Sequence, residues 1–237
     1  LHHYDELDST NVKAFELAHE GGFHGEAIVT EHQLAGKGRR GRSWVSPPGK
    51  SLAMSVIVRP EIPPSRAPEL TLVTAVALAE TLRDSGVEAR IKWPNDVQLD
   101  GKKVAGILTE MSADFDHVHH LIVGIGVNLN ARAFPDELRA IATSVALVRG
   151  APVARADFAA ALCARLEHWF NRFVADGSAP VVAAWKQHAR FFGRRVHVAA
   201  GRERLDGVAE DLEDDGALRL RLDDGTTTRV VAGEVTL

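Results

Sequence analysis

"ARIKWPNDVQLDGKKVAGILTEMS", residues 89–112, predicts a strand, a tight turn, a short strand, a hairpin turn and a third strand. Pro94-Asn95-Asp96 marks the first turn, and Asp100-Gly101 is a pair that favours two-residue hairpin loops. Strands that follow one another through tight turns do not alternate with helices, as the strands of a regular α/β chain do. The segment therefore favours the α+β class.

The segments on either side supply further strands and helices. Strands are expected over 26–33, 51–60 and 117–130, and helices over 8–21, 67–86, 155–177 and 179–193. After Gly193 the pattern changes to short alternating strands with Asp-Gly turns at 215–216 and 224–225, which is typical of a small β-barrel. The sequence thus predicts an α+β fold with two domains: a mixed-sheet main domain, residues 1–190, and a C-terminal β-barrel domain, residues 191–237.

Composition and charge narrow the class of protein. The chain has 237 residues, of which 45% are hydrophobic and 25% charged, as expected for a globular protein with its own core. The single Cys163 excludes an intramolecular disulfide and favours a reducing compartment. Neither a secretory signal nor a membrane-spanning apolar run is found, so a cytoplasmic location without membrane association is expected. A net charge of −4 and a pI near 6.3 argue against broad binding to nucleic acid.

One short segment runs against this acidic balance. "GKGRRGRSW", residues 36–44, combines four basic side chains with three glycines. Glycine lets backbone N–H groups approach a ligand, and lysine and arginine neutralise phosphate or carboxylate, so a small anionic ligand is indicated. The neighbouring Gly49-Lys50-Ser51 does not complete a Walker A loop, because Trp44 stands where its first glycine belongs. "GIGVNLN", residues 124–130, lacks the third glycine of a dinucleotide-binding turn.

Other polar clusters carry weaker signals. "KWPNDVQLDGKKVAGIL", residues 92–108, sets three lysines and two aspartates around its turns, which suits an anionic intermediate and an attacking amine or is simply a charged hairpin tip. "DFDHVHH", residues 114–120, is interpreted as a polar hairpin, since no further ligands recur at metal-site spacing. Cys163 lies among alanine and leucine of an expected helix and is interpreted as a core residue. No G-x-S-x-G motif supports acyl-serine chemistry.

Five motifs taken together resemble those of biotin–protein ligases, in the same order and rough spacing. They are "DSTN" at 8–11, "EHQLAGKGRRGRSW" at 31–44, "KWPND" at 92–96, "KKVAGIL" at 102–108 and "GIGVNLN" at 124–130. The resemblance covers almost the whole chain and implies a mixed-sheet catalytic domain of the biotin/lipoate ligase type with a small C-terminal SH3-like β-barrel. Because only Leu1 to Leu7 precede "DSTN", the chain resembles the short form without an N-terminal DNA-binding domain, and no nucleic-acid partner is expected.

The resemblance also implies a two-step reaction. Biotin and ATP, with Mg²⁺, give biotinyl-5′-adenylate and pyrophosphate, and a lysine of a biotin carboxyl carrier protein or domain then attacks the mixed anhydride. A basic loop that closes suits this chemistry, because like charges must be offset and the anhydride must be kept from water. A homodimer through the edge of the central sheet is expected on the same ground.

Candidate site residues follow from the positions that match the motifs. The implied catalytic residues are Arg39, Lys103 and Asp96. The implied biotin-binding residues are Ser9, Thr10, Asn11, Gln33, Gly36, Lys37, Gly38, Arg39, Lys103 and Gly106. The implied ATP-binding residues are Arg39, Arg42, Trp44, Lys92, Asn95 and Asn128. The resemblance also implies that Asn95 and Asp96 help place the metal and the ATP phosphates, although no residue is assigned as a metal ligand.

Individual roles come from the resemblance as well. Lys103 would contact the biotin carboxylate and the α-phosphate, and Asp96 would orient the acceptor lysine or take its proton. Thr10 and Gln33 would bond the ureido ring, because a buried polar ring needs hydrogen-bond partners. Arg39 belongs to the loop that would cover the adenylate.

Trp44 would stack on adenine, and Asn128 would bond it through its amide. The family usually has an arginine where this chain has Lys37, which keeps the charge but not the planar guanidinium. Two alternatives remain open. One is a lipoate–protein ligase, whose loop carries a Gly-Gly-Gly run that is absent here. The other is a biotin-binding module without turnover, against which the three implied catalytic residues speak.

Overall fold

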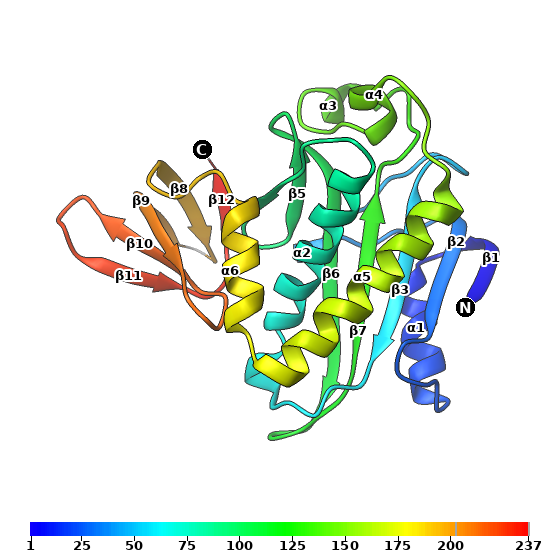
Figure 1. Cartoon of the computed structure of the whole chain (residues 1–237), viewed down its shortest axis with the longest axis horizontal. Helices are drawn as coiled ribbons and strands as arrows, with labels where there is room; N and C mark the ends of the chain where they lie inside the picture. Colours follow the sequence, from blue (N-terminus) through cyan, green and yellow to red (C-terminus); the bar gives the residue numbers. More distant parts are fainter. Residues whose placement is uncertain (202, 237) are drawn as a thin grey trace.

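The computed structural model describes residues 1–201 and 203–236, and these residues form two β-sheets (Figure 1). Arg202 and Leu237, which fall within the predicted C-terminal domain, lie outside the described residues. The strands of the larger sheet are β1 (His2–Leu7), β2 (Ala27–Gln33), β3 (Leu52–Val58), β4 (Arg90–Lys92), β5 (Asp96–Leu99), β6 (Lys102–Ala113) and β7 (Val118–Val127). Those of the smaller sheet are β8 (Arg195–Ala200), β9 (Glu203–Leu212), β10 (Leu218–Leu222), β11 (Thr227–Val230) and β12 (Glu234–Thr236).

The strand order shows that the larger sheet is mixed and the smaller one antiparallel. The larger sheet runs β1-β2-β3-β7-β6-β5-β4, and only β1 and β2 pair in parallel among its described strands. The smaller sheet runs β11-β10-β9-β8-β12 and is antiparallel throughout. The α+β class predicted from the sequence is confirmed, and the second sheet is the small C-terminal β-structure expected after Gly193.

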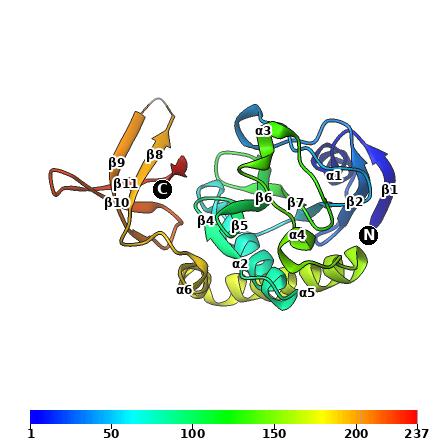
Figure 2. The same ribbon diagram turned by 90° about the horizontal axis from the view of Figure 1, so that it is seen from above.

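Helices lie on both faces of the larger sheet. The α-helices among the described residues are α1 (Thr10–His19), α2 (Glu69–Asp84), α3 (Asp136–Arg139), α4 (Val145–Arg149), α5 (Arg155–Asp176) and α6 (Ala179–His188). Seen from above, α2, α5 and α6 cover one face and α1 covers the other (Figure 2). The helix α2 lies between α5 and the sheet, so it is buried on nearly every side. Its Ala/Leu-rich sequence, which is apolar all round, suits this position. None of the helices within the described residues is long and apolar enough to cross a membrane.

The meander predicted over residues 89–112 is present as β4, β5 and β6. Asp100 and Gly101 both have positive φ, 49° and 77°, which is the conformation that a two-residue hairpin of this type requires. The hairpin sets Asp96 opposite Gly106 on the next strand. Local turn chemistry therefore positions the β4–β5 turn against the middle of β6, where the functional site lies.

The sequence analysis missed one strand and placed one helix end wrongly. The strand β1 was not expected, because "HHYDEL" has no apolar alternation; it forms by pairing with β2, with His2 bonded to Glu26 and His3 to Glu31. The helix expected to reach Gly193 ends at His188 instead. Ala189 is extended, at φ −87° and ψ 146°, and bridges to β4, which directs the chain toward the smaller sheet.

The smaller sheet packs against the larger one at the β4–β5 turn. Trp93, which is 1% exposed, donates its Nε1–H to the carbonyl of Gly216 at 3.0 Å. Lys186 of α6 forms an ion pair with Asp211 of β9 at 2.6 Å. These contacts bring the β12 edge of the smaller sheet close to the Gly/Arg loop that follows β2.

Candidate active site

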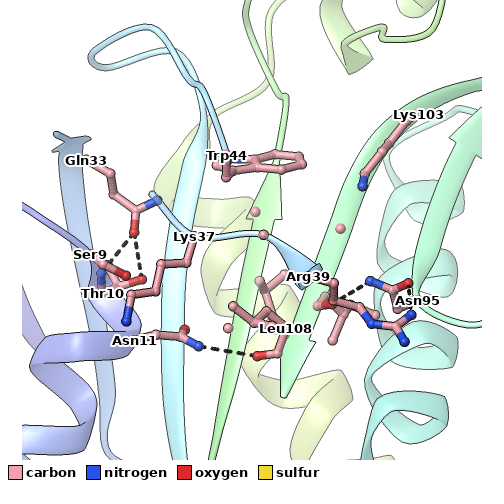
Figure 3. Close-up of a pocket in the computed structure, with 16 residues that line it drawn as sticks. Ser9, Thr10, Asn11, Gln33, Lys37, Arg39, Trp44, Asn95, Lys103 and Leu108 are labelled. Carbon is pink, nitrogen blue, oxygen red and sulfur yellow. Dashed lines mark hydrogen bonds between the residues drawn. The ribbon is translucent and has the colours of Figure 1, made fainter. Parts of the chain in front are cut away.

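A pocket, here called the inner pocket, opens on the α1 face of the larger sheet (Figure 3). It is formed by the start of α1, the loop after β2, the β4–β5 turn and the backbone of β6 and β7. The residues that line it are Ser9, Thr10, Asn11, Gln33, Lys37, Gly38, Arg39, Trp44, Asn95, Lys103, Gly106, Ile107, Leu108, Gly124, Ile125 and Gly126. The structure thus brings together every residue predicted to bind biotin except Gly36.

One end of the inner pocket is a fixed amide. The backbone N–H and the hydroxyl of Thr10 both donate to Gln33 Oε1, at 2.9 and 3.1 Å (Figure 3). Because these two bonds occupy the oxygen, the amide nitrogen of Gln33 is the group left to donate to a ligand. Ser9 and Thr10 are each 3% exposed, so this end of the pocket is buried. A buried polar ring with hydrogen-bond acceptors fits such an end better than a plain hydrocarbon chain.

Ser55 of β3 is a supporting residue that the sequence did not reveal. Its hydroxyl, which is 0% exposed, lies 2.7 Å from Thr10 Oγ1 and 2.6 Å from Asn11 Oδ1. The amide nitrogen of Asn11 donates in turn to Glu110 at 2.7 Å and to the carbonyl of Leu108 at 3.4 Å. This network fixes the rotamers of two side chains in the pocket wall.

Two glycines of β7 make room for the pocket. A Cβ on Gly124 would lie 2.1 Å from Asn11 Oδ1, and a Cβ on Gly126 would lie 2.4 Å from the ring of Trp44. Both distances are far below van der Waals contact, so no larger residue fits without displacing the wall. The two glycines of the motif "GIGVNLN" therefore allow side chains to pack closely on β7. They do not form the phosphate-binding turn of a dinucleotide site.

The loop of residues 36–44 is folded back on itself over the pocket. Trp44 N–H donates to the Gly36 carbonyl at 2.8 Å, and Gly38 N–H donates to the Arg42 carbonyl at 2.7 Å. The indole ring of Trp44 lies across the inner pocket, with Lys103 Nζ 5.6 Å from its centre (Figure 3). The free volume beneath is about 50 Å³, whereas pockets for small ligands commonly hold roughly 300–1,000 Å³. In this conformation the inner pocket is therefore smaller than such a ligand, so side chains of its lining would have to move.

Arg39 ties this loop to the β4–β5 turn. Its Nη1 donates to Asn95 Oδ1 at 2.7 Å, and Asn95 donates to the carbonyl of Ile107 at 2.7 Å. Burial lowers the pKa of Arg39 from its ordinary value, because a cation loses hydration there. Arginine remains charged in proteins, so a half-buried guanidinium with a neutral amide partner favours an anion beside it.

A second cavity, here called the outer cavity, lies between the loop, the β4–β5 turn and β12. Arg42, Lys92, Asp96 and Glu234 line it, together with Arg39, Trp44, Asn95 and Lys103, which also line the inner pocket. Arg42 donates through both terminal nitrogens to Glu234, at 3.0 and 2.6 Å, and this bonding lowers the pKa of Glu234. Lys103 Nζ lies 2.7 Å from Asp96 Oδ1. The two cavities together are lined by six lysine or arginine side chains and two carboxylates.

Two predicted site residues lie outside the walls of both cavities. Gly36 packs against the other end of the same loop, where a Cβ would lie 2.4 Å from the Trp44 carbonyl oxygen. Asn128 is 3% exposed and donates to the carbonyl of Thr143 at 3.2 Å, while its Oδ1 has no partner among the described residues. The predicted adenine contact of Asn128 stays a prediction.

The segment 114–120 and Cys163, both interpreted from the sequence as structural, add no candidate catalytic site among the described residues. In the segment 114–120, Asp114 is paired with His119 at 3.0 Å on the β6–β7 hairpin. Within the part of the chain that the structure describes, no group of three or more His, Cys, Asp or Glu residues could hold a metal ion. Cys163 packs against the core from α5, where burial raises the pKa of its thiol, so it is less available as a thiolate nucleophile.

The arrangement suits a reaction between two anions. A carboxylate in the inner pocket and a polyphosphate in the outer cavity would meet at Arg39 and Lys103, which line both spaces. Cations placed where negative charge accumulates stabilise such a transition state in a site closed to water. The carboxylate of Asp96 lines the outer cavity beside Arg39 and Lys103, where it is placed to act as a general base.

Comparison with known proteins agrees with this fold. The chain belongs to the biotin/lipoate A/B protein ligase family, whose family model matches residues 7–128. The biotin protein ligase C-terminal domain matches residues 191–237.

Particular relatives narrow the comparison. A biotin–[acetyl-CoA-carboxylase] ligase of Paracoccus denitrificans is 38% identical over 90% of this chain and 91% of its own length. The bifunctional ligase/repressor BirA of Bacillus subtilis is 37% identical over 95% of this chain and 70% of its own length. Among solved structures, biotin protein ligase from Aquifex aeolicus in complex with biotin and ATP superimposes with a TM-score of 0.86 at 27% identity, covering 99% of this chain and 96% of that one.

Proposed function

We propose that this protein is an ATP-dependent biotin–protein ligase, which forms biotinyl-5′-adenylate and transfers biotin to a lysine of a biotin carboxyl carrier protein. The observation that carries the proposal is the meeting of two cavities at Arg39 and Lys103, one with a buried hydrogen-bonding end and the other strongly basic. Relatives named for biotin ligation and a neighbour solved with biotin and ATP support biotin and ATP as the substrates.

In the first step the biotin carboxylate attacks the α-phosphate of ATP. The carboxylate oxygen forms a bond to phosphorus, the bond to the bridging oxygen breaks, and pyrophosphate leaves. Lys103, at the junction of the two cavities, is assigned to the carboxylate and the α-phosphate, and Arg42 and Lys92 to the other phosphates. The Lys103–Asp96 ion pair must exchange for this, and the phosphate offers Lys103 an equivalent anionic partner.

In the second step the amine of the acceptor lysine attacks the carbonyl carbon of the anhydride. The C–N bond forms, the bond between that carbon and the phosphate oxygen breaks, and AMP leaves. An acceptor that arrives as an ammonium ion loses two protons overall, one before attack and one as the amide forms. Asp96 is assigned to receive a proton from the amine, because it is the carboxylate nearest to Lys103 in the outer cavity.

Mg²⁺ belongs to the same proposal. Magnesium in nucleotide sites is commonly held by one or two carboxylates and the substrate phosphates, and Asp96 and Glu234 are the carboxylates that line the outer cavity. Both carboxylates are ion-paired here, Asp96 with Lys103 and Glu234 with Arg42, so they would hold a metal that arrives with ATP only as these pairs exchange. The ion would offset the negative charge of the triphosphate.

The inner end of the site favours biotin over lipoate. Gln33 and the hydroxyls of Ser9 and Thr10 suit a ring with several hydrogen-bonding groups, whereas the lipoyl ring offers none. The use of ATP and the single cysteine agree with a cytoplasmic location. A homodimer through a sheet edge also stays a prediction, for which β1 and β4 are the two edge strands.

The test is biotin-dependent exchange of pyrophosphate into ATP, with lipoate as a parallel substrate. We expect exchange with biotin and at least about 100-fold less with lipoate, since leaving buried polar groups unpaired costs about 1–3 kcal/mol each. Exchange driven by lipoate alone would overturn the assignment. Tight biotin binding without exchange would identify a binding module instead.

A further inference from the structure

A further cavity, here called the rear cavity, lies on the face of the larger sheet that α2 and α5 cover, opposite the face that α1 covers (Figure 2). It is bounded by the loop before β2, by β2, β3 and β7, and by one side of each of these two helices. Its volume is about 550 Å³, within the range of roughly 300–1,000 Å³ that pockets for small ligands commonly hold. Protein interiors are close-packed, so a space of this size between a sheet and its covering helices needs an explanation.

The floor of the rear cavity is a row of short side chains across three strands. Ala27 of β2 pairs with Val56 of β3, and Val56 pairs in turn with Val123 of β7. The neighbouring pair, Ser55 with Gly124, points to the other face of the sheet, because successive side chains of a strand alternate. The rear cavity and the inner pocket are therefore separated by the thickness of the sheet and share no lining residue.

The roof of the rear cavity is one side of α5. Cys163 and Ala164 contribute short side chains there, and Leu166 and Phe170 are half-buried beside them. Because floor and roof both carry short side chains, the helix and the sheet leave the space between them unfilled. The walls of the interior are apolar, so it accepts an apolar body and offers little to a strongly polar one.

The mouth of the rear cavity carries an unpaired negative charge. Glu167 of α5 is exposed there and is the one carboxylate of the lining, which contains neither lysine nor arginine. The residues three and four positions from it on the helix are Cys163, Ala164, Phe170 and Asn171. The arginines on either side are already paired, Arg165 with Asp84 and Arg172 with Asp176. Glu167 thus has no ion-pair partner among the described residues, and a cation at the mouth would supply one.

An aromatic pair completes the mouth. The ring of His24 lies 4.8 Å from that of Phe170, measured between centroids. The backbone N–H of Arg59 donates to Nδ1 of His24 at 3.0 Å, and burial lowers the pKa of His24 from its ordinary value, so this ring is neutral near pH 7. A free carboxylate beside an aromatic ring attracts a cation and repels an anion.

We propose that the rear cavity is a second binding site, which takes a small amphiphilic amine. The apolar body lies on the row formed by Ala27, Val56 and Val123, and the protonated amine lies at Glu167 beside Phe170. Burial of the apolar body supplies most of the affinity. The exposed carboxylate supplies the preference for a cation, because an exposed ion pair adds little affinity of its own.

The experiment compares three probes that share one apolar body and differ in charge: 4-phenylbutylamine, 4-phenylbutanol and 4-phenylbutyrate. Titration calorimetry near pH 7 measures their binding. The rate at which iodoacetamide alkylates Cys163, the single cysteine of the chain, reports whether the bound probe lies in the rear cavity.

Three variants accompany the probes. Ala164→Phe fills the cavity from its roof, and Ala161→Phe adds the same ring at an exposed position of the same helix outside the lining. Glu167→Gln removes the charge at the mouth and keeps the shape of the side chain. Thermal unfolding checks that each variant is folded.

We expect the amine to bind at least about fivefold more tightly than the carboxylate, with the alcohol between them, since attraction to Glu167 replaces repulsion. Bound amine should slow the alkylation of Cys163 at least about fivefold, because the probe covers the thiol. Glu167→Gln should bring the three affinities within about twofold of one another. Ala164→Phe should weaken amine binding at least about tenfold, and Ala161→Phe should leave it unchanged.

Equal binding of the three probes, no binding of any of them, or binding that leaves the alkylation rate unchanged would each overturn the inference. Amine binding that persists in a folded Ala164→Phe variant would do the same. If this variant does not fold, the loss of preference in the exposed Glu167→Gln variant still decides the question. The measurements need no turnover, so a failure of biotin-dependent exchange would overturn the proposed function and leave this inference standing.

Discussion

Replacement of Ser55 by alanine tests whether the buried network behind the pocket determines biotin affinity. The hydroxyl of Ser55 is fully buried and contacts Thr10 and Asn11 at 2.7 and 2.6 Å. A hydroxyl has one hydrogen, so Ser55 donates to one of these oxygens at a time and merely contacts the other, because the Thr10 hydroxyl itself donates to Gln33. Ser55→Ala leaves at least one buried oxygen without a donor, which costs about 1–3 kcal/mol.

That free energy should appear in two measurements. Urea unfolding should show a fall of about 1–3 kcal/mol in the free energy of unfolding. Titration calorimetry should show biotin affinity weakened by roughly 5- to 150-fold, since about 1.4 kcal/mol is a factor of ten and both partners line the pocket. The KM for ATP should be nearly unchanged, because Ser55 lies behind the inner pocket and away from the outer cavity.

Ser51 provides a matched control next to the same strand. It is 4% exposed, and its hydroxyl has no hydrogen-bond partner among the described residues. Ser51→Ala removes the same atom from a similar depth without breaking a bond, so it should cost neither stability nor affinity. If Ser55→Ala weakens biotin binding no more than Ser51→Ala does, the network has no part in recognition and the reasoning is refuted.

Three further predictions concern the charged residues. Lys103→Ala should slow adenylate formation by about 100-fold or more while biotin affinity changes by less than about tenfold, and the exposed Lys102→Ala should change neither, as measured by single-turnover kinetics and calorimetry. Arg39→Gly should shorten the lifetime of bound adenylate by at least about tenfold, since the loop loses a buried contact to the β4–β5 turn, and serum albumin should become labelled. Glu234→Gln should lower the free energy of unfolding at pH 7 by no more than about 1 kcal/mol, because the pair with Arg42 is partly exposed.

The stability contributed by the Arg42–Glu234 pair should depend on pH in a defined direction. Arg42 holds the pKa of Glu234 below its ordinary value, so the pair contributes stability above about pH 4.3, the usual pKa of glutamate. This contribution is lost as the pH falls through the lowered pKa, and the difference between Glu234→Gln and the unsubstituted protein should vanish there. A difference that grew in acid would contradict this linkage.

The other two variants have refuting outcomes of their own. Equal losses of rate and affinity in Lys103→Ala would refute the role of Lys103, and labelling of the carrier alone by Arg39→Gly would refute the role of Arg39.

The sequence predicted the parts of the site that depend on local chemistry. The Asp100-Gly101 pair allowed the β5–β6 hairpin to be placed, because few other residues accept positive φ at both turn positions. The Gly/Arg loop was recognisable from its composition, and most of the residues that matched the motifs line the two cavities. These features are encoded within a few residues of one another.

The features that were missed depend on contacts across the chain. Within "SLAMSVIV", residues 51–58, Ser55 shows no sign of function in the sequence. It contributes to the site because the pleat of β3 turns its side chain toward α1, where it meets Asn11 beside Gly124. The strand β1 is too polar to be recognised alone and is stabilised by pairing with β2. Glu234 lies in an unremarkable final strand, and its contact with Arg42 spans 192 residues.

The separation of Arg42 and Glu234 in the sequence has a consequence during synthesis of the chain on the ribosome. Synthesis adds about 5–20 residues per second, so Arg42 is synthesised roughly 10 to 40 s before Glu234. During that interval the main sheet can form while the Gly/Arg loop has no anchor on the smaller sheet. A nascent chain in this condition would bind a reactive adenylate poorly, and only a finished chain would hold it securely.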